Sequence, residues 1–128
     1  MRTMAQKRAE YALGKVLKAS EGKTANEKKD FQSFTASAPS MILQNGFGQS
    51  IAFWAAKGKS KHLVLFDMIV KWLSLKEKDI NNSFATKTEK SEFMRELSQM
   101  DQSKYLSAQN ETLALLEWVK RFANADLS

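Results

Sequence analysis

The apolar residues of this chain recur at intervals of three and four positions, and this spacing constrains the fold more than any other feature of the sequence. Residues with this spacing lie on one side of an α-helix, whereas a half-buried strand requires strict alternation. The chain has few β-branched residues and no alternating run. We therefore predict an all-α fold, a compact bundle of about five to six helices that forms a single domain over residues 1–128.

Two capping boxes mark the first two helices. Thr3 with Gln6, and Thr24 with Glu27, match the pattern in which a Thr side chain and a Glu or Gln three residues later cap each other's backbone. We expect the first helix to end near residues 20–22. We expect the second to end before Pro39, because a proline suits the first turn of the helix that follows.

The third predicted helix runs from Pro39 to Gly58 and contains Asn45-Gly46, which by local rules is a turn signal. Helical spacing continues through it, so we expect Gly46 inside the helix on the core side, where a missing side chain lets another helix approach closely. Gly48 is expected on the opposite, uncharged side. The predicted core arc consists of Ile42, Leu43, Phe47, Ile51, Phe53 and Trp54.

Three further helices complete the predicted bundle. The same spacing gives a helix over residues 62–76, a shorter one around Phe93 and Leu97, and a last one over residues 103–124, while residues 77–90 read as a loop. Apolar residues cover more than half the circumference of the last helix. It is therefore either the central helix of the bundle or a helix that meets a neighbouring molecule.

Catalytic and metal-binding groups are scarce. The chain has no cysteine and a single histidine, His62, so only carboxylates could act as ligands or acid–base groups. Most of them stand beside Lys or Arg on helix faces, which is typical of a solvated surface. Asp67 lies in an apolar helix and could be partly buried, where a Lys or Arg partner is the better explanation. We expect no enzyme activity, no metal and no cofactor.

Two features of the sequence resemble a phosphate-binding loop and a membrane span, and in each case the residues argue against that interpretation. Gly58-Lys59-Ser60 resembles the end of a phosphate-binding P-loop, but Phe53 stands where that motif needs a glycine. The uncharged segment 31–56 contains too many polar side chains for a membrane span. The first 18 residues carry charges throughout and hold no apolar run of the signal-peptide kind. We expect a cytoplasmic protein with no membrane association.

Basic residues are unevenly distributed. Lys and Arg number 20 against 14 Asp and Glu, a net charge of +6, and residues 1–29 and 57–78 are the basic segments. Such segments favour contact with the backbone of an extended polyanion, without base stacking, because the nearby aromatic residues look like core. For any single lysine, an ordinary soluble surface is the alternative. The candidate RNA-binding residues are Arg8, Lys15 and Lys18 on one side of the first helix, and Lys57, Lys59 and Lys61 at a helix junction.

The uncharged segment 31–56 also suggests a surface that is covered by protein. The other helices carry Lys and Glu on their outer sides, but the outer side of the third predicted helix carries amides and small residues. We therefore predict a subunit-contact face, with a neighbouring subunit lying close to Gly48. Its candidate residues are Gln44, Asn45, Gly48 and Gln49.

Three segments resemble a known family. MRTMAQKRAEYAL at residues 1–13, ILQNGFGQSIAFWAAKG at residues 42–58 and ETLALLEWVKRFANA at residues 111–125 are similar to the small helical subunit of the type III-B CRISPR effector, the RAMP-module (Cmr) complex. The resemblance follows the chain in order from end to end. The loop at residues 77–90 is the segment with the weakest match.

The resemblance implies an all-helical protein without catalytic activity of its own. In that family several copies stack as a minor filament beside the backbone subunits that hold the CRISPR RNA, and together they frame the groove for target RNA. The expected partners are therefore the other subunits of the complex, copies of the same chain, and CRISPR RNA and target RNA. A pure protein-interaction subunit, whose basic residues face acidic subunits, is the alternative. An enzyme with a carboxylate-bound metal is a third reading, which lacks convergent ligands.

Overall fold

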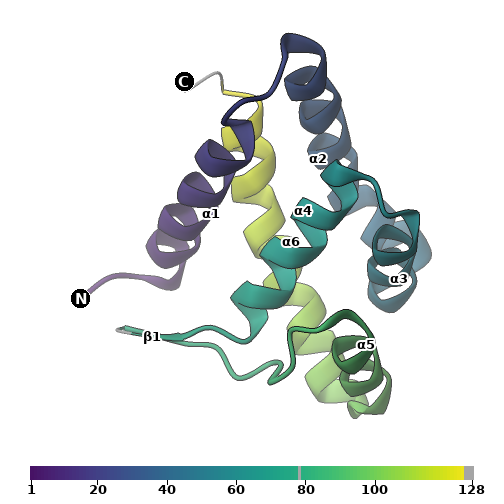
Figure 1. The fold of residues 1–128 in the computed structure, drawn as a ribbon. Helices are drawn as coiled ribbons and strands as arrows, with labels where there is room; N and C mark the ends of the chain where they lie inside the picture. The colour runs from purple at the N-terminus through teal and green to yellow at the C-terminus, as the bar shows by residue number, and fades with distance from the viewer. Residues whose placement is uncertain (78, 126–128) are drawn as a thin grey trace.

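A computed structural model describes residues 1–77 and 79–125, and these residues form six α-helices and one short β-hairpin (Figure 1). The elements are α1 (Met4–Ser20), α2 (Ala25–Asn45), α3 (Phe47–Lys57), α4 (Ser60–Leu73), β1 (Lys76–Glu77), β2 (Ile80–Asn81), α5 (Lys90–Gln99) and α6 (Gln102–Ala123). The all-α prediction is confirmed. The predicted short helix around Phe93 and Leu97 is α5, and α6 begins and ends within one residue of its predicted bounds.

Both capping boxes form as predicted. The Gln6 amide N–H donates to Thr3 Oγ1 at 3.1 Å, and the Thr3 N–H donates to Gln6 Oε1 at 2.8 Å. Thr24 and Glu27 repeat the arrangement at 3.2 and 2.9 Å. Each box satisfies two backbone N–H groups that a helix start leaves without partners, so it fixes where α1 and α2 begin.

The predicted boundary at Pro39 is wrong. Pro39 is buried inside α2, which continues six residues beyond it to Asn45. A proline inside a helix costs about 3 kcal/mol, because it removes a backbone hydrogen bond and crowds the preceding turn. The burial of Phe34, Ala38 and Ile42 on the same helix offsets that cost.

The prediction of an unbroken helix through Gly46 is also wrong. Gly46 lies between α2 and α3 with φ +91° and ψ 155°, a region that is almost restricted to glycine. Its N–H donates to the Ile42 carbonyl at 2.8 Å and its carbonyl accepts from the Ser50 N–H at 3.1 Å, so one residue closes α2 and opens α3. A Cβ built on Gly46 would have no heavy atom within 4 Å. Backbone conformation, and not close packing, therefore explains this glycine.

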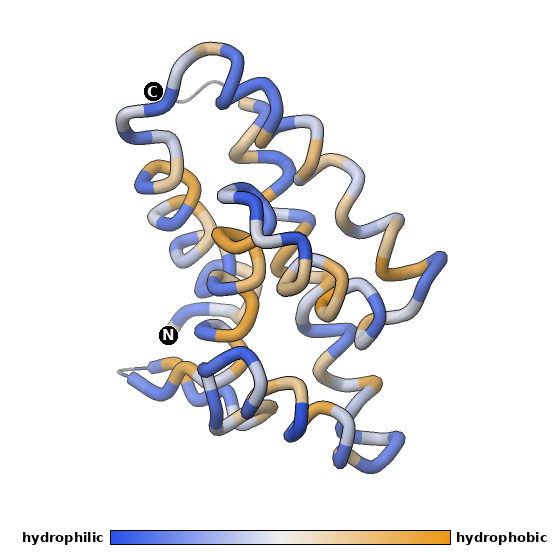
Figure 2. Tube along the Cα trace, turned by 45° about the vertical axis from the view of Figure 1, so that its right-hand side comes forward, coloured by the Kyte–Doolittle hydropathy of each residue, from blue (hydrophilic) through white to orange (hydrophobic). Residues whose placement is uncertain are grey.

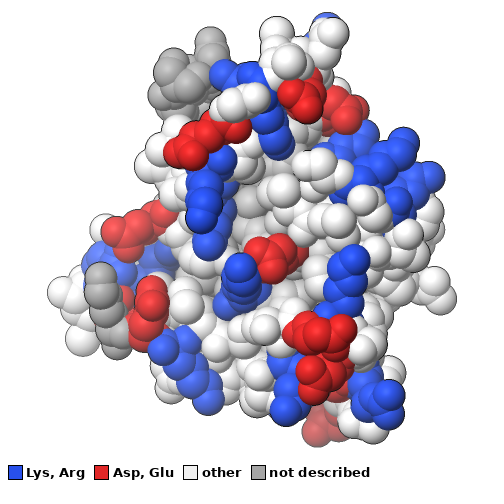
Figure 3. Space-filling view, viewed as in Figure 1, with Lys and Arg blue, Asp and Glu red and all other residues white. Residues whose placement is uncertain are grey.

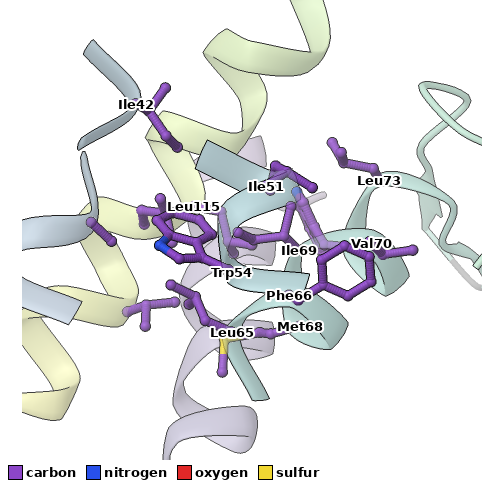
Figure 4. Close-up of a cluster of buried hydrophobic side chains, with 14 of the residues drawn as sticks. Ile42, Ile51, Trp54, Leu65, Phe66, Met68, Ile69, Val70, Leu73 and Leu115 are labelled. Carbon is purple, nitrogen blue, oxygen red and sulfur yellow. The ribbon is translucent and has the colours of Figure 1, made fainter. Parts of the chain in front are cut away.

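Helix α6 is the central helix and packs against α1, α2 and α4. Along each helix, hydrophobic and hydrophilic stretches alternate (Figure 2), as expected for a helix with one buried and one exposed side. The indole of Trp54, from α3, is fully buried and lies in a cluster with Leu65 and Ile69 of α4 and Leu115 of α6 (Figure 4). The wide apolar surface of α6 is thus covered largely by the chain itself.

A polar network crosses this core. The Glu111 carboxylate of α6 is 8 % exposed and accepts hydrogen bonds from Arg8 Nε at 2.6 Å and Arg8 Nη2 at 3.0 Å. The indole N–H of Trp72, from α4, donates to the same carboxylate at 3.0 Å. This carboxylate therefore joins α1, α4 and α6.

The segment after α4, which the sequence reads as a loop, contains a two-stranded antiparallel hairpin of two-residue strands. Asn82 anchors it, because the buried Asn82 side chain donates to the Trp72 carbonyl at 2.8 Å. Further along, the Glu96 carboxylate accepts from the backbone N–H groups of Thr86 and Lys87 at 2.9 and 3.0 Å. Side-chain anchors thus fix a segment that has little regular structure.

Candidate nucleic-acid interface

The turn between α3 and α4, residues 57–61, carries three of the predicted RNA-binding lysines and is called the lysine turn below. Lys57 ends α3, Gly58 adopts a left-handed conformation with φ +70°, and α4 begins at Ser60. Lys and Arg side chains gather over this turn, at the right of the view in Figure 3. Lys57 and Lys59 are exposed, and no carboxylate of the described residues lies within salt-bridge distance of either.

Lys61 differs from the other two lysines. Its ammonium donates to Asp30 Oδ1 at 2.8 Å and lies 5.8 Å from the centre of the Phe34 ring. The hydrogen bond from Lys61 holds the pKa of the Asp30 carboxyl below its ordinary value. Lys61 therefore ties α4 to α2 as well as adding charge to the turn.

His62, the residue after the turn, lies within the electrostatic field of the three lysines. Its ring is buried and lies 4.6 Å from the Phe34 ring, centre to centre. Burial lowers the pKa of His62 below its ordinary value of 6.5, and the charges of the three nearby lysines lower it further. The turn therefore combines positive charge with an imidazole whose pKa that charge lowers.

The lysines of α1 lie at a separate place. Lys15 and Lys18 line a hollow of about 200 Å³ between α1 and α4, together with Asp67 and Lys71. Asp67 pairs with Lys71 at 2.9 Å, so its predicted basic partner is confirmed. Its side chain is 56 % exposed, so the prediction that it is partly buried in an apolar helix is wrong. These lysines can contribute a second patch of positive charge.

Arg8 belongs to neither patch. Two of its guanidinium nitrogens bind Glu111, and its side chain is 21 % exposed. The hydrogen bonds to Glu111 raise the pKa of Arg8 above its ordinary value. Because this guanidinium is committed to the interior network, we leave Arg8 out of the RNA-facing surface proposed below.

The predicted contact residues lie around the α2–α3 junction. Gln44, Asn45 and Gln49 are exposed, whereas Gly48 is partly buried by the chain itself. The Gly48 N–H donates to the Tyr105 hydroxyl of α6 at 2.7 Å, and a Cβ built on Gly48 would lie 3.2 Å from the same oxygen. Tyr105 of the same chain therefore lies close to Gly48, and the contact with a neighbouring subunit stays a prediction. No local pattern in the sequence indicates this long-range pair.

Two residues of the predicted core arc are exposed. Leu43 is 70 % exposed and Phe53 is 48 % exposed, whereas Trp54 and Ile51 are fully buried. The predicted arc assumed one straight helix, but the break at Gly46 turns α3 relative to α2. The exposed aromatic ring of Phe53 is a surface feature that the helical spacing did not reveal.

Two hollows flank Gln49. One has a volume of about 570 Å³ and is lined by Met41, Gln44, Asn45, Gln49, Ser50 and Phe53. The other, of about 360 Å³, lies between α3, α5 and the start of α6, and is lined by Gly48, Gln49, Ala52, Met94, Leu97, Ser98 and Tyr105. None of these lining residues is charged, so the junction offers an uncharged, uneven surface beside the lysine turn.

The described part of the chain holds neither a metal-binding cluster nor a membrane-spanning helix. Within residues 1–77 and 79–125, no three His, Cys, Asp or Glu side chains lie close enough together to hold a metal ion. None of the helices in the described part of the chain is long and apolar enough to cross a membrane.

Comparison with known proteins gives a consistent result. The model of the family described as "CRISPR-associated protein (Cas_Cmr5)" matches residues 4–126. The "CRISPR system Cmr subunit Cmr5" of Thermus thermophilus is 31 % identical over 98 % of this chain and 96 % of its own length. The crystal structure of a CRISPR-associated Cmr5 family protein from the same organism superimposes with a TM-score of 0.75 at 28 % identity, covering all of both chains. The chain therefore belongs to the Cmr5 family of CRISPR-associated proteins.

Proposed function

We propose that this protein is a non-catalytic structural subunit of an RNA-guided type III-B CRISPR ribonucleoprotein, the Cmr complex. Several copies stack as the minor filament, and their basic surface lines the groove for target RNA. Its partners are the other subunits of the complex, copies of itself, and CRISPR RNA and target RNA. Membership of the Cmr5 family and the Cmr-subunit name of the Thermus relative support the proposal.

The observation that carries the RNA contact is the lysine turn. Lys57 and Lys59 are exposed, and neither forms a salt bridge with the described residues. Unpaired ammonium groups on a short turn can each neutralise one phosphate and release its counterion. The lysine charges that lower the pKa of His62 would also attract a polyanion to this turn. A backbone contact of this kind needs no base sequence.

The test is the salt dependence of RNA binding. We expect Lys57→Gln with Lys59→Gln to lower the affinity for single-stranded RNA and to reduce the slope of log K against log salt by about 1.4, since each phosphate contact contributes about 0.7. The matched control is Lys87→Gln with Lys90→Gln, two exposed lysines near the start of α5. An unchanged slope for the first pair, or an equal change for the control pair, would contradict the assignment.

A pure protein-interaction subunit is the second candidate function. The uncharged surface between the two hollows, with exposed Gln49 and Ala52, favours a protein contact there. Gln49→Arg should leave the isolated protein folded but weaken its incorporation into the Cmr complex. The control Gln102→Arg, at the exposed start of α6, should affect neither folding nor incorporation. If the lysine-turn variants leave RNA binding unchanged while Gln49→Arg blocks assembly, the second function is the correct one.

A further inference from the structure

Phe53 is an exposed aromatic ring beside a basic turn. It lies on α3 one helical turn before Lys57, and the Lys57 ammonium lies 5.5 Å from the centre of its ring. Nearly half of Phe53 is exposed, whereas its neighbour Trp54 is fully buried. Aromatic rings next to lysines are the platforms on which single-stranded nucleic acids stack their bases. The structure thus supplies the aromatic group that the sequence-based expectation of pure backbone contact left out.

The 570 Å³ hollow adjoining this ring has the chemistry of a base-edge site. Three exposed amide side chains line it, those of Gln44, Asn45 and Gln49. Each amide both donates and accepts hydrogen bonds, as the edges of nucleobases do. No charged side chain lines the hollow.

Ser50 supplies an independent observation in the same hollow. Its side chain is 1 % exposed and lines the hollow, and its Oγ has no hydrogen-bond partner among the described residues. Buried hydroxyl groups are seldom left unpaired, because an unmade hydrogen bond in the interior is costly. The Ser50 hydroxyl, like the buried Trp54 Nε1 and His62 Nδ1, thus leaves polar interior atoms in the described part of the chain unpaired around this hollow and the adjacent turn.

We propose that the hollow beside Phe53 receives one unpaired nucleobase of single-stranded RNA, which stacks on the Phe53 ring and hydrogen-bonds to the surrounding amides. The phosphates on either side of this nucleotide lie along Lys57 and Lys59. This inference rests on the proposed RNA contact and adds a base-holding site to it. Because every base has a stacking face, the site holds a base with little preference for its identity.

An apolar protein segment is the competing occupant. It would use Met41 and Phe53, but it would leave the unpaired lysines of the adjacent turn without a counter-charge. A nucleotide satisfies the ring, the amides and the ammonium groups together. Charge complementarity within one helical turn of Phe53 therefore favours RNA.

The experiment measures binding of the full-length protein to a short fluorescein-labelled RNA strand, and to the same strand with abasic riboses, by fluorescence anisotropy. We expect Phe53→Leu to weaken binding of the intact strand about 5- to 150-fold, the range expected for loss of one stacked base, with an unchanged salt slope. Phe53→Tyr keeps the ring and should bind within about twofold of the native protein. Leu106→Ala, an exposed apolar residue outside the hollow, is the matched control.

The abasic strand tests whether the ring and the base act on each other. It should bind the native protein more weakly than the intact strand does, and Phe53→Leu should then cause no further loss, since the two changes remove one interaction. Far-UV circular dichroism of each variant checks that the helices are retained.

The outcomes separate this inference from the proposed function. The base site is refuted, and the RNA contact stands, if the Lys57 and Lys59 variants bind RNA more weakly but either of two other changes has no effect. These changes are Phe53→Leu tested with the intact strand, and the abasic strand tested with the native protein. If the native protein binds neither strand, both are refuted. If Phe53→Leu impairs incorporation into the complex and leaves RNA affinity unchanged, the occupant is a protein and the base site is refuted.

Discussion

Replacement of Arg8 should be among the most damaging single changes to the stability of the fold. Its guanidinium provides two of the three hydrogen bonds that the buried Glu111 carboxylate accepts, and Trp72 provides the third. Arg8→Met keeps much of the aliphatic packing of the side chain but leaves a carboxylate that is 8 % exposed with a single donor. Loss of one partner of a buried ion pair costs about 3–5 kcal/mol.

The magnitude can be narrowed from the structure. The Arg8 side chain is 21 % exposed, so water can reach part of the site and the loss should fall to about 2–4 kcal/mol. For a chain of this size, about 1 kcal/mol shifts Tm by roughly 4 °C, so we expect Tm to fall by about 8–16 °C. Thermal and urea unfolding followed by circular dichroism measure both quantities.

Two further variants test the reasoning. Glu111→Gln in the Arg8→Met background removes the stranded charge but keeps an oxygen for Trp72, so it should recover part of the lost stability. Arg2→Met is the matched control, because Arg2 pairs with Asp79 and Glu10 at the exposed surface, and its loss should be much smaller. A loss below about 0.5 kcal/mol for Arg8→Met, or no recovery in the double variant, would refute a central role for this pair.

Two other predictions concern pH and the glycines of the α2–α3 junction. Because the folded state lowers the pKa of His62 below 6.5, the unfolded state binds more protons below that pH, and stability should fall as the pH decreases through and below 6.5. His62→Gln should flatten this part of the curve of unfolding free energy against pH, and an unchanged curve would exclude His62 as its cause. Gly46→Ala should cost about 1–3 kcal/mol because of its positive φ. Gly48→Ala should be nearly neutral, because the gain in helix propensity of about 1 kcal/mol offsets the crowding of Tyr105. Equal losses at the two glycines in urea unfolding would contradict this distinction.

Local signals predicted most of the helices correctly. The Thr3 and Thr24 capping boxes act over three residues, so their sequence pattern determines the start of the helix almost alone. The break at Gly46 was missed because two local rules disagreed there: helical spacing favoured continuity, and the Asn45-Gly46 pair favoured a turn. The turn rule was the correct one, since only glycine readily adopts the backbone conformation that the junction requires.

The candidate site was harder to predict because it depends on non-local geometry. The exposure of Phe53 follows from the change of direction at Gly46, which a helical wheel drawn through the break cannot represent. The pairing of Arg8 with Glu111 joins residues far apart in the sequence, and charge counting alone placed Arg8 on the surface. The exposed Lys57 and Lys59 were predictable because a helix junction that contains glycine seldom buries its neighbours.

The central claim, that the lysine turn faces target RNA inside the Cmr complex, is tested most directly by crosslinking. The assembled complex containing this subunit would be bound to a photoreactive target RNA, irradiated, digested and analysed by mass spectrometry. We predict crosslinked nucleotides on peptides that contain Lys57 or Lys59, and their loss when both lysines are replaced by Gln. Crosslinks confined to the other subunits, with this chain fully incorporated, would contradict the claim.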